Sequence, residues 1–173
     1  MRRFLCTPYT AILFVMALVV GCEEFDAPWQ AINDAFYFNS FESARDTAGW
    51  HGYGGMAVVP GGSPGGGHQS VQVSGGCLVP HATLTIAGPR EDSYVLLRCW
   101  GRNLALGGAL ELGRAGDLSK WISIVVTDSS WRHYQSPDTL FCPAGEHLTI
   151  SMSSGGIVYS SMMVDQLEIR KVR

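Results

Sequence analysis

The sequence has very little lysine and no cluster of basic residues. Among its 173 residues only Lys120 and Lys171 are lysines, and 12 basic side chains stand against 15 acidic ones. A surface that binds nucleic acid needs a basic stripe to neutralise phosphates. The composition therefore argues against nucleic acid as a partner. It also gives an anionic membrane surface nothing that would attract the body of the protein.

Motifs of common catalytic sites are also missing. The sequence has no GxSxG elbow and no HExxH helix, and the glycine-rich run 61–67 lacks the lysine and the following helix of a phosphate-binding loop. Asp128, Ser129 and His133 lie too close together on one predicted strand to form a catalytic triad by themselves. We therefore predict that the protein is not an enzyme.

Cysteines are few and widely spaced. Beyond the N-terminal segment only Cys77, Cys99 and Cys142 remain, and none belongs to a CxxC pair, which argues against a zinc site. Three cysteines allow three different single disulfides. We favour Cys99 with Cys142, because both end apolar strand-like runs. Three buried, unpaired thiols are the equal alternative.

The N-terminal segment carries the pattern of an export signal. Arg2 and Arg3 precede an apolar run at 11–20, which is too short to span a bilayer comfortably, and Cys22 follows a small residue. The Val-Val-Gly-Cys ending resembles the bacterial lipobox, which implies that residues 1–21 are removed and that Cys22 is acylated. An ordinary signal peptide or an N-terminal anchor helix is the alternative.

The lipobox resemblance implies a location as well as an anchor. Residues 22–35 would form the lipidated cysteine and a tether, and membrane contact would come through the acyl chains alone. In enteric lipoproteins an aspartate after the cysteine signals inner-membrane retention. Glu23 stands there, so the resemblance favours the outer membrane of the bacterial envelope. Loss of Arg2 and Arg3 leaves ten basic and fifteen acidic residues, a formal charge of −5.

Residues 36–173 show the pattern of one all-β domain. Short β-branched, aromatic or alternating runs recur between turn sequences. They lie at 36–41, 56–59, 70–73, 82–86, 94–100, 121–127, 147–152 and 164–169. Only 103–112 has a weak helical pattern, and its glycines argue against a helix. Many short strands separated by turns predict an antiparallel β-sandwich.

Six short motifs follow one another in a familiar order over about 130 residues. They are Asn39-Ser40-Phe41-Glu42 with Gly49-Trp50, Gly67-His68-Gln69-Ser70-Val71-Gln72-Val73, Tyr94-Val95-Leu96-Leu97 with Trp100, Thr127-Asp128-Ser129-Ser130-Trp131-Arg132-His133-Tyr134, Pro143-Ala144-Gly145 before Leu148-Thr149-Ile150, and Val164-Asp165-Gln166-Leu167-Glu168-Ile169. This order resembles the CenC-type carbohydrate-binding modules, which are jelly rolls of the galactose-binding-like superfamily. The resemblance implies a jelly roll more strongly than it implies a function.

The same resemblance implies one structural Ca²⁺ ion. Family members commonly hold calcium where the first and last strands meet, and the matching side chains here are Glu42 and Asp165, with a carbonyl near His68. Oxygen ligands of this kind suit Ca²⁺. Gln166 replaces a second acid that the family often has. The alternative is that both carboxylates cap turns or accept backbone hydrogen bonds.

A sugar site needs aromatic faces for stacking and polar groups for hydroxyls. The candidate ligand residues are Tyr53, Arg98, Trp100, Arg102, Tyr134 and Tyr159. Trp100 is chosen because a side chain at a strand end can leave the core. We expect Trp121 and Trp131 to pack in the core, whereas Trp50 suits either a sealing or a cleft-lining role.

Two functions are consistent with these observations. The first is a lipid-anchored, non-catalytic protein that binds polysaccharide or cell-wall glycan at the bacterial envelope. The second is a structural or protein-interaction module of an envelope assembly. A groove with two or more exposed aromatic faces favours the glycan, and a flat apolar patch favours a protein partner.

Overall fold

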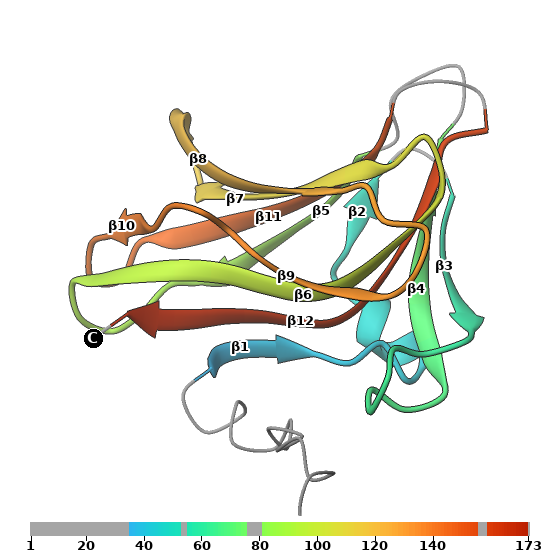
Figure 1. Ribbon diagram of the computed structural model, residues 1–173. Helices are drawn as coiled ribbons and strands as arrows, with labels where there is room; N and C mark the ends of the chain where they lie inside the picture. Colours follow the sequence, from blue (N-terminus) through green and yellow to red (C-terminus); the bar gives the residue numbers. More distant parts are fainter. Residues whose placement is uncertain (1–34, 53–54, 76–80, 156–158, 173) are drawn as a thin grey trace, which may run out of the picture.

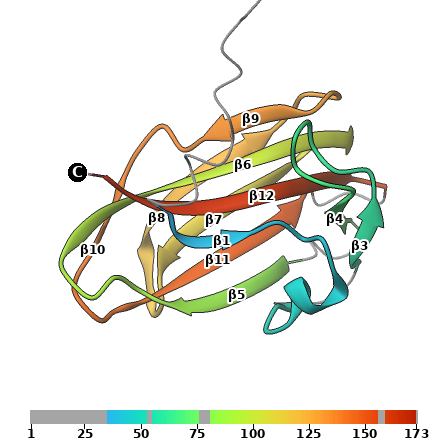
Figure 2. The same cartoon turned by 90° about the horizontal axis from the view of Figure 1, so that it is seen from below.

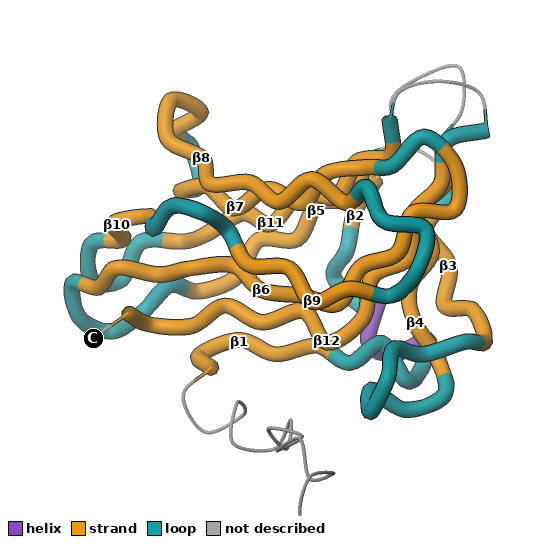
Figure 3. Tube along the Cα trace, viewed as in Figure 1, coloured by secondary structure: helices purple, strands orange, loops and turns teal. Residues whose placement is uncertain are grey.

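The computed structural model describes residues 35–52, 55–75, 81–155 and 159–172, and the fold is an antiparallel β-sandwich of the jelly-roll type (Figures 1 and 3). Its strands are β1 (Ala35–Asn39), β2 (His51–Gly52), β3 (Met56–Pro60), β4 (Gln69–Ser74), β5 (His81–Ala87), β6 (Ser93–Ala105), β7 (Gly108–Arg114), β8 (Asp117–Val126), β9 (Arg132–Gln135), β10 (Leu140–Cys142), β11 (His147–Ser154) and β12 (Ser161–Val172). Within the described ranges, the only helix is the 3-10 turn η4 (Ala44–Thr47). No described helix has the length and apolar character needed to cross a membrane.

Two sheets form the layers of the sandwich. The seven-stranded sheet has the order β10-β6-β12-β4-β3, with β1 added to β12 and β9 added to β6. The five-stranded sheet has the order β2-β5-β11-β7-β8. The long strands β6 and β12 pair along almost their full length, and Figure 2 shows the short strands β1 and β9 beside them.

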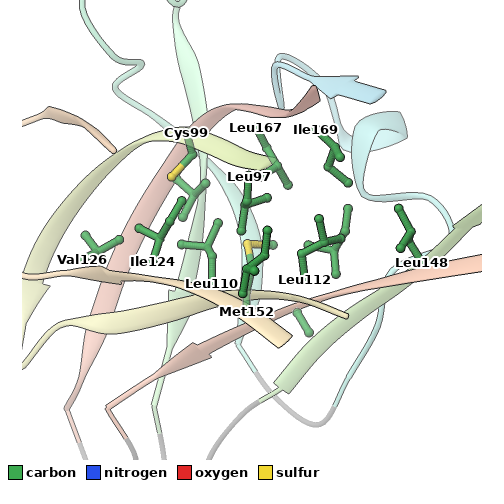
Figure 4. Close-up of a cluster of buried hydrophobic side chains, with 14 of the residues drawn as sticks. Leu97, Cys99, Leu110, Leu112, Ile124, Val126, Leu148, Met152, Leu167 and Ile169 are labelled. Atoms are coloured by element: carbon green, nitrogen blue, oxygen red, sulfur yellow. The ribbon is translucent and has the colours of Figure 1, made fainter. Parts of the chain in front are cut away.

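The core lies between the sheets because apolar residues alternate along the strands. In β6, Val95, Leu97 and Cys99 are fully buried. From the five-stranded sheet, Leu148 and Ile150 of β11 meet them, together with residues of β7 and β8 (Figure 4). Burying one such side chain stabilises the fold by about 1.5–3 kcal/mol. The strands expected at 94–100 and 147–152 are confirmed.

The weak helical pattern at 103–112 is a strand hairpin. Leu106 and Gly107, both at positive φ, form the turn between β6 and β7, with φ values of 58° and 71°. The side chain of Asn103 accepts the Gly107 N–H at 2.7 Å and so closes the turn. Gly107 is one of the glycines that argued against a helix, and its freedom to adopt positive φ allows the chain to reverse here. Strand β7 was not expected from the sequence, whereas the strand-like run that ends at Cys142 is strand β10.

The favoured disulfide between Cys99 and Cys142 is wrong. Both residues are buried free thiols. Strand β10 pairs with the start of β6, so that Cys142 lies opposite Ser93. Cys99 is six residues further along β6, a separation of about 20 Å, which no disulfide spans. Cys77 lies outside the described residues.

Candidate functional site

The outer face of the seven-stranded sheet carries most of the predicted ligand residues that the structure describes. Alternation along β6 buries Val95, Leu97 and Cys99, and it therefore turns Arg98, Trp100 and Arg102 outward, as expected. Trp100 reaches this face from the middle of β6 rather than from a strand end, because the strand continues to Ala105. The three residues thus lie in one row on one surface.

Cross-strand pairing extends that row into a surface. At one end Tyr94 lies opposite Phe141 of β10 and Val172 of β12. All three are exposed, with 55%, 42% and 40% of their surface accessible. The rings of Tyr94 and Phe141 lie 5.3 Å apart between centroids and are tilted by 52°. This pair presents two aromatic faces to solvent, and neither residue was selected from the sequence.

A groove of about 950 Å³ lies on this face, beside the aromatic pair. Strands β1, β6, β9, β10 and β12 and the turn before β6 contribute its walls. The groove is lined by Ala35, Phe36, Glu91, Asp92, Ser93, Tyr94, Leu96, Arg98, Gln135, Phe141, Arg170, Lys171 and Val172. Its volume falls within the range of small-molecule sites, and it combines aromatic and aliphatic surface with polar groups.

Arginines and one buried acid occupy the centre of this surface. Arg98 lies opposite Glu168 of β12 on one side and Gln135 of β9 on the other. Glu168 is only 6% exposed although it points outward. Its Oε2 atom lies 3.8 Å from Nε of Arg170. Burial raises the pKa of Glu168, and the charges of Arg98 and Arg170 oppose that rise.

Further along β6 the outward side chains form two aromatic contacts. The ring of Trp100 meets the ring of His133 edge-on, 5.7 Å between centroids. The guanidinium of Arg102 lies 5.6 Å from the centre of the Trp131 ring, a cation–π contact. Burial, and then the charge of Arg98, lowers the pKa of His133. Trp131 is thus part of the outer surface and not of the core, contrary to expectation.

Of the three predicted tyrosines, the two that the structure describes do not join this surface. Tyr134 packs against the core, and its hydroxyl donates to Oδ2 of Asp128 at 2.7 Å while it accepts the Asp128 N–H at 3.1 Å. That hydroxyl closes the turn before β9 and has little capacity left for a ligand. Tyr159 is 84% exposed, but it lies before the start of β12, at the opposite end from Tyr94. Tyr53 lies outside the described residues.

Trp50 and Trp121 have different roles. Trp50 packs against Phe41, 6.3 Å between ring centroids, and so seals the core. Trp121 is half-buried on the outer face of the five-stranded sheet, and the expectation that it packs in the core is wrong. Its indole lies over Gly113, where a Cβ atom would come within 2.5–2.8 Å of the ring. The alternation with buried Ile122 and Ile124 could have shown that Trp121 points outward.

Glu42 and Asp165 approach the same glycine-rich loop, between β3 and β4. Oδ2 of Asp165 accepts the Ser63 N–H at 2.8 Å. Oε2 of Glu42 accepts the His68 N–H at 3.1 Å. Burial raises the pKa of Asp165 most strongly, and the charge of Glu42 adds to the rise against the hydrogen bonds from Ser63 and Gln166. The carboxylates therefore accept backbone hydrogen bonds, which was the alternative expected from the sequence.

The same loop can pack closely against these side chains because it contains glycine. A Cβ atom on Gly66 would collide with Ser63 Oγ, Asp165 Oδ2 and Gln166 Nε2. Within the part of the chain that the structure describes, no group of three or more His, Cys, Asp or Glu side chains is arranged to hold a metal. Any cation here would need backbone or hydroxyl oxygens besides the two carboxylates.

Comparison with known proteins supports the architecture. The sequence matches no protein-family model and no curated protein. A CBM22 xylan-binding domain from Paenibacillus barcinonensis has a TM-score of 0.56 at 21% identity, over 81% of this chain and 96% of that one. A carbohydrate-binding module of Cellvibrio mixtus lichenase 5A, solved with cellotriose, has a TM-score of 0.51 at 15% identity, over 80% and 99%.

The fold is also present outside binding modules. The enzymatically active domain of tailspike protein 4 from bacteriophage CBA120 has a TM-score of 0.56 at 15% identity, over 77% of this chain but 20% of that one. At such identities the similarity establishes the jelly-roll fold alone. The function must be argued from this chain's own surfaces.

Proposed function

We propose that this protein is a non-catalytic, lipid-anchored glycan-binding protein of the bacterial envelope, and that the groove beside Tyr94 and Phe141 receives the glycan. The observation that carries the proposal is the exposed aromatic pair next to a groove of about 950 Å³. Sugar rings stack their C–H faces on aromatic rings. Arg98 and Gln135 in the same groove supply donors and an acceptor for hydroxyls.

The structural neighbours support a glycan as the ligand. One is a xylan-binding domain and another was solved with cellotriose. The particular residues of this groove, however, come from this chain alone.

The carboxylates around the groove support binding without catalysis. Oε1 of Glu91 accepts a hydrogen bond from Nζ of Lys171 at 2.8 Å, and Oδ1 of Asp92 accepts the Ala144 N–H at 2.8 Å. Glu168 is buried between two arginines. A pair of carboxylates that cleaves glycosides needs one acid free to protonate the leaving oxygen and one to act on the opposite face. Of the acids near this groove, Glu91 and Asp92 accept hydrogen bonds from other residues and Glu168 is buried beside arginines.

The lipid anchor would keep the groove close to the membrane. Cys22, the proposed acylation site, lies outside the described residues. Twelve residues lie between it and Ala35, which lines the groove, so thirteen Cα-to-Cα steps join the two. Fully extended, such a segment reaches about 45 Å. An outer-membrane anchor would therefore hold the binding groove within that distance of the lipid surface.

Calcium remains part of the proposal. Glu42 and Asp165 would bind the ion, and backbone oxygens of the loop between β3 and β4 would complete its shell. Two neighbouring carboxylates, one of them buried, carry negative charge that a divalent cation would offset. The ion would tie β12 to the loop between β3 and β4 and so stabilise the fold.

Affinity electrophoresis of residues 23–173 through a polysaccharide panel tests the proposal. This piece contains every described element. We expect one glycan class to retard the protein, and we expect Tyr94→Ala and Phe141→Ala to abolish the retardation. Trp121→Ala is the matched control, because it removes an outward aromatic ring from the other sheet.

The outcomes separate the alternatives. Loss of retardation in Trp121→Ala alone would move the glycan site to the five-stranded sheet. Unchanged migration of the folded protein across the whole panel would contradict glycan binding and favour the envelope-assembly module. Leu106, which is 64% exposed at the β6–β7 turn, is an apolar contact that such a module could use. Radiolabelled palmitate incorporation that is lost in Cys22→Ser tests the anchor.

A further inference from the structure

A second pair of aromatic rings lies on the same outer face, beyond the groove. Trp100 of β6 and His133 of β9 are cross-strand neighbours, and their rings meet edge-on with centroids 5.7 Å apart. We propose that this pair forms a second platform for the same glycan, and that the protein binds an extended, linear glycan chain across both platforms. This inference rests on the proposed glycan-binding function and names the class of chain.

The groove leads directly to this second pair. Arg98 and Gln135 line the groove and lie opposite each other on β6 and β9. Trp100 and His133 are the next outward residues along the same two strands, which run side by side in Figure 2. A sugar chain that leaves the groove past Arg98 and Gln135 would therefore meet the two rings.

Both rings of the second platform have surface to offer a sugar. His133 is exposed and Trp100 is half-buried. Neighbouring residues cover part of the imidazole, and this partial burial, followed by the charge of Arg98, lowers the pKa of His133. The imidazole is therefore neutral at neutral pH, with one N–H donor and one nitrogen acceptor for sugar hydroxyls. The indole of Trp100 supplies an apolar face.

The next side chains along this face are engaged with each other. The guanidinium of Arg102, two residues beyond Trp100, lies 5.6 Å from the centre of the Trp131 ring. Nη2 of Arg102 also donates to Sδ of Met163 at 3.2 Å. The second platform therefore consists of Trp100 and His133, and Arg102 and Trp131 border it.

The separation of the two platforms sets the length of the ligand. Trp100 is six residues from Tyr94 on the same strand, about 20 Å along it. One sugar ring cannot span that distance, so only a chain of several sugars reaches both platforms. Affinity should then increase with chain length, because both contacts belong to one ligand.

The direction of the row favours a straight chain. Tyr94, Arg98 and Trp100 all lie on the outer face of a single strand. A β-1,4-linked glucan is extended, so its successive sugars can follow such a row. An α-1,4-linked glucan coils and turns its later sugars away from the sheet. Because both are built from glucose, comparing them isolates the shape of the chain.

Titration calorimetry with cello-oligosaccharides and malto-oligosaccharides of two to six sugars tests the inference. We expect residues 23–173 to bind cellohexaose at least about 10-fold more tightly than cellotriose, because the longer chain reaches a further aromatic anchor. The malto-oligosaccharides should show no such increase. An equal or larger increase in the malto series would overturn the assignment of a straight chain. Affinity that does not change with length in either series would overturn the second platform.

Variants of the two platforms locate the effect. Trp100→Ala should remove the increase with length and change the affinity for cellotriose less than about twofold. Tyr94→Ala with Phe141→Ala should weaken binding of both cellotriose and cellohexaose. Trp121→Ala is the matched control, because it removes an indole from the other sheet, and it should keep the increase with length.

The result that overturns this inference differs from the one that overturns glycan binding. If cellotriose and cellohexaose bind equally and Tyr94→Ala weakens both, the second platform is refuted and glycan binding stands. If neither series binds to protein with a native circular dichroism spectrum, this inference is refuted, and the polysaccharide panel decides glycan binding separately. If Trp100→Ala does not fold, His133→Ala must still reduce the increase with length, and an unchanged increase refutes the second platform.

Discussion

The two outer faces of the sandwich follow the same alternation and differ in chemistry. The five-stranded sheet turns mainly hydroxyl side chains outward, among them Thr85, Thr149 and Ser123, with Glu111 and one indole. The seven-stranded sheet turns out Tyr94, Phe141 and several arginines. The groove described above lies on the second face, beside its pair of exposed aromatic rings. An outward aromatic residue is therefore not enough to define a site. The residues opposite it on the neighbouring strands determine whether it belongs to one.

The length of the strands accounts for much of this difference. In the seven-stranded sheet, the short strands β1, β9 and β10 flank the long pair β6 and β12. Each contributes side chains to one stretch of the groove wall. In the five-stranded sheet Trp121 lies flat on Gly113, so its ring covers the sheet. The first arrangement gives the groove walls on several sides, whereas the second leaves one indole ring lying on the sheet.

The largest effect expected is the loss of glycan binding when both rings of the aromatic pair are removed. Tyr94→Ala with Phe141→Ala should weaken binding about 100-fold, or about 2.7 kcal/mol, because central aromatic contacts dominate binding energies. Isothermal titration calorimetry measures the change. Trp121→Ala should alter the affinity less than about twofold, and a loss equal to that of the double variant would contradict the distinction between the faces.

The next effect concerns stability on the five-stranded face. Gly113→Val places a side chain where the Trp121 ring lies, so the indole must move. We expect a loss of about 2 kcal/mol in the free energy of unfolding, typical of overpacking. Urea unfolding measures it. Glycan affinity should not change, and a parallel loss of affinity would show that this face takes part in binding.

Calcium bound beside the seven-stranded sheet should raise the free energy of unfolding by somewhat less than the loss expected for Gly113→Val. At ten times its dissociation constant, a bound ion adds about 1.4 kcal/mol to the free energy of unfolding. The thermal midpoint should therefore rise with added Ca²⁺ and fall back with EDTA. Asp165→Asn should remove the response, whereas Glu111→Gln on the other sheet should keep it. A rise that persists in Asp165→Asn would exclude this carboxylate as a ligand.

The smallest effect is a pH dependence of opposite sign at two acids, Glu91 in the groove wall and the buried Glu168. The pKa of Glu168 is raised by burial, so its contribution to stability is present at low pH and is lost as the pH rises through the folded-state value. The pKa of Glu91 is lowered by its hydrogen bond and charge interaction with Lys171, so its contribution is present at neutral pH and is lost as the pH falls.

Thermal midpoints of wild type, Glu168→Gln and Glu91→Gln between pH 3 and 8 measure both contributions. Wild type should lose stability relative to Glu168→Gln as the pH rises above about 4.5, the usual glutamate value. Wild type should gain stability relative to Glu91→Gln as the pH rises toward the usual glutamate pKa. Trends of the same sign in both variants would contradict the assigned environments.

Much of the fold was predictable from the sequence, because alternation is local. The buried and outward positions of β6 and β11 follow from residues two apart. The outward position of Trp121 was equally readable from the isoleucines that follow it. The pairing of Cys99 with Cys142 failed for the opposite reason: it required the register between β6 and β10, which no local pattern contains.

The candidate site divides in the same way. Arg98, Trp100 and Arg102 were found because one strand carries all three. Phe141, Gln135 and Arg170 were missed because they come from other strands and are neighbours only in space. Glu168 could not be distinguished from an ordinary surface acid until its burial was known.

By itself, the sequence determines that this chain folds into an all-β sandwich, which side chains of each strand face the core, and that the charge is acidic overall. Only the tertiary structure decides which outward rows become neighbours, where the groove lies, and that Glu168 is buried beside Arg98 and Arg170. The physical reason is that alternation depends on adjacent residues, whereas register joins residues far apart in the sequence, such as Tyr94 of β6 and Val172 of β12.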